Sequence, residues 1–151
     1  MEMTATEFKN GETIPVKYAC DGDNVSPEIE ITDSDNKGYY ILVMDDPDAP
    51  GALFTHWIIY NIPATVKKIK GNIDKNEVTE DGFYQGVNDF NKIGYDGPCP
   101  PGNSTHRYYF ILYKTDNFID KKRVTSSEIF PMVEPLKNKI EFYSTYSRTK
   151  K

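Results

Sequence analysis

The stretch "YYILVMDDPDAPGALFTHWIIYNIP" (residues 39–63) decides the fold. It holds two runs of branched and aromatic residues, at 39–45 and 55–62, and a similar run, "RYYFILYK", follows at 107–114. Gly, Pro, Asp or Asn bounds each run, which is typical of short strands. Their almost continuous apolarity predicts central strands that are buried on both faces, or a sandwich core. The sequence therefore predicts a mainly β protein.

Weaker patterns add further strands to this prediction. "PEIEIT" (27–32) alternates apolar and acidic residues and predicts a half-exposed strand. "TIPVKY" (13–18) is a weaker candidate, which Pro15 places at a sheet edge. "IEFYSTY" (140–146) predicts a final strand.

Helical signals are few. Glu128 follows a Ser/Thr cluster and indicates a helix start, while Pro131 and Pro135 limit the helix length because an interior proline costs about 3 kcal/mol. The long segment 63–105 shows no lasting amphipathic period, so we expect a functional loop or short strands there. One or two short peripheral helices are predicted.

Length and charge restrict the class of protein. The 151 residues are close to the usual size of one domain, and we expect a single domain over 1–151. The net charge of −5, without a basic stripe, disfavours nucleic acid as a partner. No apolar run reaches the roughly 20 residues of a membrane span, and the N-terminus does not look like a signal peptide. We therefore expect a soluble, cytoplasmic protein.

Two cysteines, Cys20 and Cys99, are too few for a disulfide scaffold. They could form one bridge if the fold brings them together. Because the cytosol keeps most thiol pairs reduced, we expect two reduced, partly buried thiols.

Side chains that can carry chemistry gather in two segments. The first runs from Asp45 to His56, and the second is "GYDGPCPPGNSTHRYYF" (94–110), which contains His106. Both histidines open a predicted core strand beside an aromatic residue. If these two strands are neighbours, the imidazoles converge at one end of the sheet. The DPDAP turn then forms one wall of a pocket and the glycine–proline loop forms the other.

Three chemistries fit such a pocket. Two histidines and two aspartates could bind a divalent metal, but no close ligand spacing such as HExxH supports this. Ser104 and Thr105 lie beside His106 as potential nucleophiles, although the GxSxG elbow is missing. Imidazoles, a tyrosine hydroxyl and backbone N–H groups can instead bind a small anion, with an aspartate holding a histidine as a cationic donor. Taken singly, DPDAP also fits an ordinary proline turn, and Arg107 a partner for a scaffold carboxylate.

The ordered motifs "DPDAP", "THW", "NDF", "GYDGPCPP" and "HRYYF" resemble the phosphatidylethanolamine-binding protein family, also called the Raf kinase inhibitor protein family. "KYACDGDNVSPEI" and "YSTY" fit its short bacterial and archaeal branch, so the resemblance spans nearly the whole chain. The resemblance implies a large antiparallel sheet packed on a smaller one, Greek-key-like, with a few short peripheral helices. It also implies a shallow anion pocket at one sheet edge.

The family motifs assign the ligand-binding residues by position. No catalytic residue, metal or cofactor is expected. The predicted ligand-binding residues are Asp46, Asp48, His56, Gly97, Pro98, His106 and Tyr108.

Three departures from the family pattern concern other parts of the chain. Ile31 stands where members often have Trp, and Asn91 stands where they often have Gly. No counterpart of the long C-terminal helix of animal members is evident, which disfavours kinase regulation of the animal type.

The resemblance favours a non-enzymatic binding protein for a phosphate-like or carboxylate group, such as phosphorylethanolamine. Because family members inhibit kinases or serine proteases, either class of enzyme is an expected partner, and related microbial proteins imply a homodimer. One alternative is a weak hydrolase or phosphoryl-handling enzyme in which His56 is the base and Asp46 orients it. Another is an interaction scaffold with a vestigial pocket.

Overall fold

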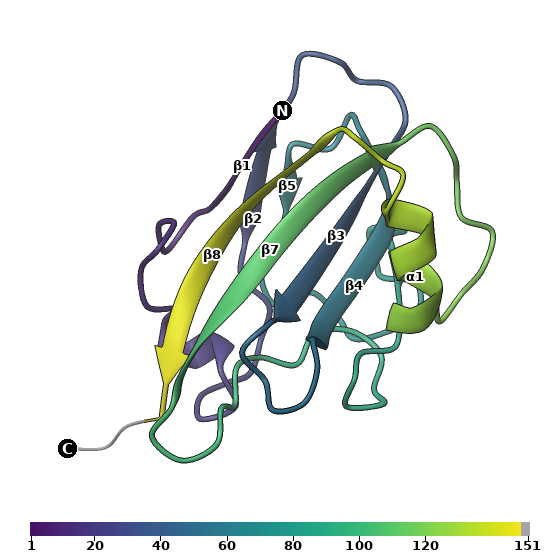
Figure 1. Cartoon of the computed structure of the whole chain (residues 1–151). Coiled ribbons are helices and arrows are strands. Elements are labelled where there is room, and N and C mark those ends of the chain that lie inside the picture. The colour runs from purple at the N-terminus through teal and green to yellow at the C-terminus, as the bar shows by residue number, and fades with distance from the viewer. Residues whose placement is uncertain (149–151) are drawn as a thin grey trace.

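The chain folds into two antiparallel sheets and one α-helix, as seen in a computed structural model that describes residues 1–148 (Figure 1). The large sheet has the strand order β6-β4-β3-β7-β8, and the small sheet has the order β1-β2-β5. The elements are β1 (Glu2–Ala5), the 3-10 helix η1 (Val16–Tyr18), β2 (Ile29–Thr32), β3 (Tyr39–Asp46), β4 (Phe54–Pro63), β5 (Lys68–Ile69), β6 (Tyr84–Gln85), β7 (Thr105–Thr115), α1 (Ser126–Val133) and β8 (Lys139–Ser147). The predicted fold class, a large antiparallel sheet on a smaller one, is confirmed.

Alternation along the strands divides the buried residues into two clusters. Tyr40, Leu42 and Met44 of β3 face the small sheet and belong to the main core. Ile41 and Val43 of the same strand face the opposite way, toward α1. Both faces of β3 and β4 are therefore buried, as their continuous apolarity predicted.

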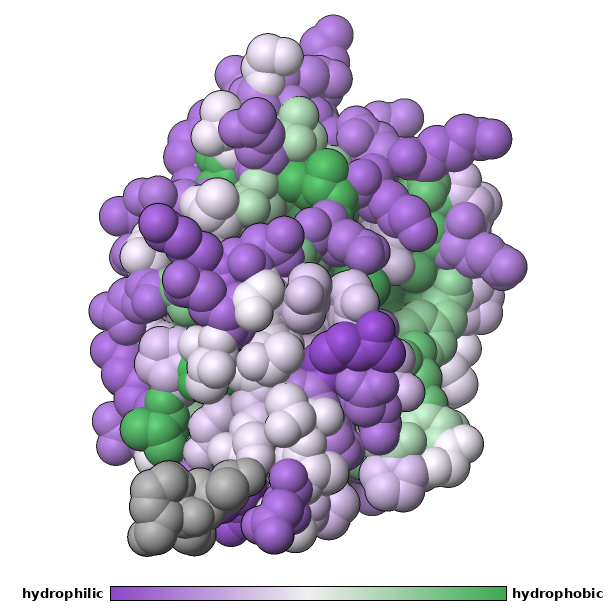
Figure 2. Space-filling view, turned by 60° about the vertical axis from the view of Figure 1, so that its left-hand side comes forward, coloured by the Kyte–Doolittle hydropathy of each residue, from purple (hydrophilic) through white to green (hydrophobic). Residues whose placement is uncertain are grey.

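One face of β7 differs from the prediction. Its residues alternate between buried and partly exposed positions, because the eight-residue α1 contacts only part of the sheet. Figure 1 shows α1 on the near side beside β4, with no element in front of β7 and β8. On this face Arg107 is consequently exposed, and Tyr109 and Ile111 are only partly buried. Figure 2 shows a largely hydrophilic surface, with hydrophobic residues in small areas and in a strip along its right-hand side.

The strand predicted at 13–18 is wrong. The segment makes a 3-10 turn at Val16–Tyr18, in which the Tyr18 N–H donates to the Pro15 carbonyl at 3.0 Å. Only Thr13 keeps a strand-like bridge, to Thr145. The other strand predictions and the helix start are confirmed, and a reciprocal capping box between Thr125 and Glu128 begins α1.

A Cys20–Cys99 disulfide replaces the two reduced thiols that we expected, so that prediction is wrong. The Cys20 N–H donates to the Pro98 carbonyl at 3.0 Å, which lays the segment after η1 against the glycine–proline loop. Because 79 residues of sequence separate the two cysteines, loop-closure entropy predicts a stabilisation of about 4 kcal/mol. Over residues 1–148, no helix is long and apolar enough to cross a membrane.

Candidate ligand-binding site

Both histidines lie at the end of the large sheet where β3 ends and where β4 and β7 begin. They are not on neighbouring strands, as the convergence argument assumed, because β3 lies between β4 and β7. They nevertheless converge on one side chain. The Tyr108 ring centroid lies 5.3 Å from that of His56 and 6.3 Å from that of His106.

A pocket of about 150 Å³ opens at this point. This volume is well below the roughly 300–1,000 Å³ of drug-sized ligand sites, so it fits a small group. The DPDAP turn and the glycine–proline loop both contribute to its wall. The pocket is lined by Asp46, Ala49, Pro50, Phe54, His56, Phe90, Cys99, Pro100, Pro101, His106 and Tyr108. Four of the seven predicted ligand-binding residues thus line it, and Asp48, Gly97 and Pro98 do not.

Asp46 orients His106 rather than His56. Its Oδ2 lies 2.6 Å from Nδ1 of His106, and both side chains are almost fully buried. The other ring nitrogen of His106, Nε2, is 3.2 Å from the Ser104 hydroxyl oxygen, and that hydroxyl donates its own proton to the Pro101 carbonyl at 2.7 Å.

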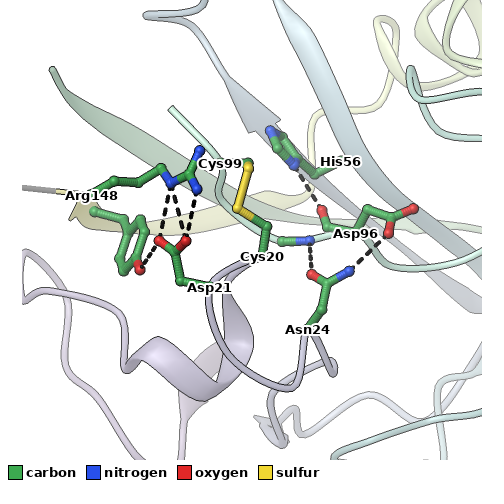
Figure 3. Close-up of a disulfide and its surroundings, with 9 residues drawn as sticks. Cys20, Asp21, Asn24, His56, Asp96, Cys99 and Arg148 are labelled. Carbon is green, nitrogen blue, oxygen red and sulfur yellow. Dashed lines mark hydrogen bonds and ion pairs between the residues drawn. A yellow bond between two sulfur atoms is a disulfide. The ribbon is translucent and has the colours of Figure 1, made fainter. Parts of the chain in front are cut away.

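His56 is held by a backbone carbonyl instead. Its Nδ1 donates to the Asp96 carbonyl oxygen at 2.7 Å (Figure 3). Burial lowers the pKa of His56 below its usual value of 6.5, and this outweighs the opposing effects of the Asp96 carbonyl and of nearby carboxylates. The free His56 ring is therefore neutral at pH 7, with the proton on Nδ1 and a lone pair on Nε2.

The glycine–proline loop is fixed by a polar network behind the pocket (Figure 3). Asn24 donates to the Asp96 carboxylate at 3.0 Å and accepts the Gly97 N–H at 2.7 Å. That N–H is consequently occupied within the protein. A Cβ at Gly97 would lie 1.9 Å from the Tyr18 carbonyl oxygen, so only glycine fits this close approach. Gly97 therefore supports the glycine–proline wall of the pocket without lining it.

Pro98 and Cys99 continue the same wall. The Pro98 carbonyl accepts from Cys20, and the disulfide ties Cys99, a pocket-lining residue, to the segment after η1. The wall that carries Pro100 and Pro101 is thereby covalently attached to a second part of the chain.

Asp48 holds the turn to β7. Its carboxylate accepts from Arg107 through Nη2 at 2.8 Å, Nε at 3.0 Å and the backbone N–H at 2.8 Å. These bonds lower the pKa of Asp48 to about 2. The scaffold role predicted for Arg107 is confirmed, and the carboxylate that it pairs with is Asp48.

The Tyr108 hydroxyl is buried at the pocket wall. Among the described residues it has no hydrogen-bond partner of ordinary geometry. Burial, and then the nearby negative charge of Asp46, raises the pKa of Tyr108 above its usual value, so the hydroxyl keeps its proton. An unsatisfied buried hydroxyl costs about 1–3 kcal/mol, which an acceptor on a ligand would recover.

Sequence reasoning missed the apolar part of the pocket. Phe54 and Phe90 form an aromatic cluster with His56, with ring centroids 4.8 to 5.5 Å apart. Phe90 belongs to the "NDF" motif, in which the Asn88 side chain accepts the Phe90 N–H at 2.9 Å. The sequence signal for this residue was a large aromatic side chain directly after Asn88 and Asp89. In the structure Phe90 is 39% exposed and lies beside the buried His56 ring. Within residues 1–148, no three His, Cys, Asp or Glu side chains are grouped so as to hold a metal ion.

Comparisons with known proteins identify the family of the chain. A family model described as phosphatidylethanolamine-binding protein matches residues 4–143. A UPF0098 protein from Aquifex aeolicus is 46% identical over 116 residues, which cover 75% of this chain and 67% of that protein. A UPF0098 protein from Archaeoglobus fulgidus is 39% identical over 146 residues, 95% of this chain and 50% of that protein. The chain thus spans between half and about two thirds of the length of these two relatives.

A solved structure has the same fold. It is described as a phosphatidylethanolamine-binding protein homologue from Chlamydia trachomatis, with a TM-score of 0.85, 30% identity and 97% coverage of both chains. The chain belongs to the phosphatidylethanolamine-binding protein family, and this membership implies a ligand-binding protein.

Proposed function

We propose that the protein binds a small anionic group, a phosphate or a carboxylate of the kind carried by phosphorylethanolamine, without turning it over. The observation that carries the proposal is the Tyr108 hydroxyl, a protonated donor at the pocket wall that makes no hydrogen bond of ordinary geometry within residues 1–148, with the Asp46 carboxylate as the nearby acceptor. An oxygen of a phosphate or carboxylate is the natural acceptor. His106, which Asp46 orients, lines the same wall with its Nε2 beside the Ser104 hydroxyl.

His56 completes the donor set only when it takes up a proton. With Nδ1 bound to the Asp96 carbonyl, its Nε2 faces a ligand as an acceptor in the neutral ring and as a donor in the charged ring. A bound anion favours the charged ring and thus raises the His56 pKa. Anion binding is therefore accompanied by proton uptake, or a monoprotonated phosphate donates to Nε2.

The seven family-assigned residues divide into two roles in this proposal. His56, His106 and Tyr108 contact the ligand, and Asp46 positions His106. Asp48, Gly97 and Pro98 hold the two walls in place through Arg107, Asn24 and Cys20. Phe54 and Phe90 favour an apolar or methylene part on the bound group.

Two histidines in the whole chain make the test direct. Imidazole ¹⁵N NMR of the full chain, titrated with phosphorylethanolamine, should shift both rings saturably. Asp46→Asn should abolish the His106 response, while Asp120→Asn, which removes an exposed carboxylate outside the pocket, should retain the affinity. If neither ring responds to phosphorylethanolamine, phosphate or acetate, the pocket is vestigial and the interaction-scaffold alternative replaces this proposal.

A second candidate function has one observation in its favour. Ser104, His106 and Asp46 form a hydrogen-bonded series of the serine–histidine–aspartate type, with distances of 3.2 and 2.6 Å. This differs from the His56–Asp46 pair of the sequence-based alternative. The Ser104 proton, however, points to the Pro101 carbonyl, so Nε2 is not arranged to remove it. Hydrolysis of p-nitrophenyl acetate that Ser104→Ala abolishes would favour this enzyme and contradict a purely binding role.

Partners and location extend the proposal. A serine protease or a kinase is the proposed target, tested by stoichiometric inhibition that Asp46→Asn weakens.

We also propose that residues 1–151 form one domain, because one core cluster joins both sheets. A homodimer is the proposed oligomeric state. The proposed cytoplasmic location has to accommodate the disulfide, since such bonds persist inside cells chiefly in hyperthermophiles.

A further inference from the structure

A second cavity lies on the opposite face of the large sheet from the anion pocket. Its volume is about 530 Å³, and it lies between the uncovered outer face of β7 and α1. Tyr109 and Ile111 of β7 form its floor, Phe130 of α1 one side, and Leu53 of the β3–β4 turn another. We call this cavity the outer groove. Its existence follows from the short α1, which leaves β7 uncovered here.

Asp45 is a buried carboxyl group that lines the outer groove. It is 5% exposed, and one carboxylate oxygen, Oδ1, accepts the Thr55 hydroxyl at 2.9 Å. Its Oδ2 accepts no hydrogen bond from any described residue. Because adjacent strand residues point to opposite faces, Asp45 faces the outer groove while Asp46 faces the anion pocket. A carboxylate oxygen that no protein group occupies is available to a donor in the groove.

The charges around the outer groove favour a cationic donor. Glu141 of β8 adds a second carboxylate to the lining, and Asp89 contributes further negative charge at Asp45. Arg107 is the one cationic side chain in the lining, and Asp48 already holds its guanidinium through two hydrogen bonds. Lys139, which lies over the Tyr113 ring, is a second cation beside the groove, so Asp45, Glu141 and Asp89 leave it acidic on balance.

The aromatic residues of the groove suit a cation with an apolar body. Tyr109 already accepts the Arg107 guanidinium at 5.8 Å from its ring centroid, and Tyr113 accepts Lys139 at 5.9 Å. Cation–π contact is thus the local mode of interaction. Phe130 and Ile111 provide apolar surface beside these rings.

We propose that the outer groove is a second binding site, which takes a small organic ammonium ion with an apolar body. The ammonium group donates to the free oxygen of Asp45, and the body lies against Tyr109, Ile111 and Phe130. This site is separate from the anion pocket and does not depend on the function proposed for it.

Burial raises the pKa of Asp45 to about 7, and Asp89 contributes to the rise. The groups that face or adjoin this carboxyl are Thr55, Asp89, Glu141, Arg107 and Tyr113. A bound ammonium ion favours the charged carboxylate and lowers that pKa. Amine affinity should therefore increase as the pH rises from 6 to 8, the reverse of the dependence expected for anion binding at His56.

The test is an NMR titration of the full chain with phenethylammonium chloride at pH 7.5, observing the Asp45 carboxyl carbon and the Ile111 methyl groups. Both should shift saturably. The neutral analogue 2-phenylethanol should bind at least about tenfold more weakly, since a hydrogen bond to a charged group is the stronger kind. Asp45→Asn, which keeps an oxygen for Thr55, should reduce amine affinity by a similar factor. Asp120→Asn, which removes the same charge from an exposed loop, should not.

Three results would overturn the proposal. One is equal binding of the ammonium ion and the alcohol, and another is full affinity in Asp45→Asn with an unchanged fold. The third is the absence of an amine-induced shift together with concentration-dependent broadening of Ile111, which would make the groove a contact between two copies of the chain. The imidazole spectrum of each variant shows whether the rest of the fold is intact.

Discussion

Replacing Tyr108 by Phe should make the free protein more stable and a weaker anion binder. The substitution removes one oxygen from a buried site where it has no hydrogen-bond partner of ordinary geometry among residues 1–148. Leaving such a group unsatisfied costs about 1–3 kcal/mol, so Tyr108→Phe should raise the free energy of unfolding by about 1 kcal/mol. For a chain of 151 residues, this corresponds to an increase in Tm of roughly 2–4 °C.

Ligand binding should change in the opposite direction. A hydrogen bond to a charged acceptor contributes about 1.5–3 kcal/mol, so the variant should bind phosphorylethanolamine roughly 10- to 100-fold more weakly. Urea denaturation of the free protein gives the first quantity, and isothermal titration calorimetry gives the second. Both measurements belong at the same pH, because anion binding is coupled to the protonation of His56, whose pKa burial lowers.

Tyr95→Phe is the matched control. Tyr95 is also fully buried, but its hydroxyl donates to the Tyr18 carbonyl at 2.7 Å. Its removal leaves that carbonyl unsatisfied and should lower the stability by about 1–2 kcal/mol. If Tyr108→Phe also lowers the stability by such an amount, its hydroxyl has a partner in the free protein and the reasoning is refuted. Unchanged anion affinity in Tyr108→Phe would refute the binding role separately.

Three further predictions concern pH and redox state. The pKa of His56 lies below 6.5 in the free protein, and a bound anion raises it. Acetate affinity should therefore fall by up to tenfold per pH unit as the pH rises from the His56 pKa of the free protein to that of the complex. Calorimetry from pH 5 to 8 checks this, and a flat profile contradicts it. The pKa of Asp45 rises from 3.8 to about 7 on folding, so its contribution to stability is complete below pH 3.8 and is lost as the pH rises through 7. Asp45→Asn should thus be more stable than the parent at pH 8, by up to about 4 kcal/mol, with the difference vanishing near pH 4 in urea denaturation curves. Reduction of Cys20–Cys99, or their joint replacement by Ser, should lower the unfolding free energy by about 4 kcal/mol, and denaturation curves that coincide with and without reductant would show that the bridge does not form.

The strong strands could be predicted because their continuous apolar residues indicate burial on both faces. β3 and β4 are apolar on both faces, and both faces are covered. The same reasoning overestimated β7, since the composition of a strand does not show how far a helix from elsewhere in the chain reaches across it. β5 and β6 lie in segment 63–105, where a functional loop or short strands were expected, but their positions could not be predicted because strands of two residues carry no periodicity. The prediction for residues 13–18 depended on Pro15, and proline suits a 3-10 turn as well as an edge strand.

For the candidate site, the motifs located both walls but could not assign the contacts. Asp46 and Asp48 are two residues apart and look equivalent in the sequence, yet one faces His106 and the other Arg107. That difference arises from side-chain direction at the end of β3. Gly97 was predicted as a ligand-binding residue, whereas its N–H is used by Asn24, 73 residues earlier in the chain. Such long-range partners are set by tertiary packing and leave no local signal.

The Cys20–Cys99 bridge closes a covalent ring that contains β2 to β6 and leaves β1, β7, α1 and β8 outside it. The exposed part of the β3–β4 turn around Gly51 lies on this ring. A protease that cuts the turn there yields two pieces that still migrate together on a gel without reductant and separate when reductant is added. The two walls of the pocket therefore remain parts of one covalent molecule after such a cut.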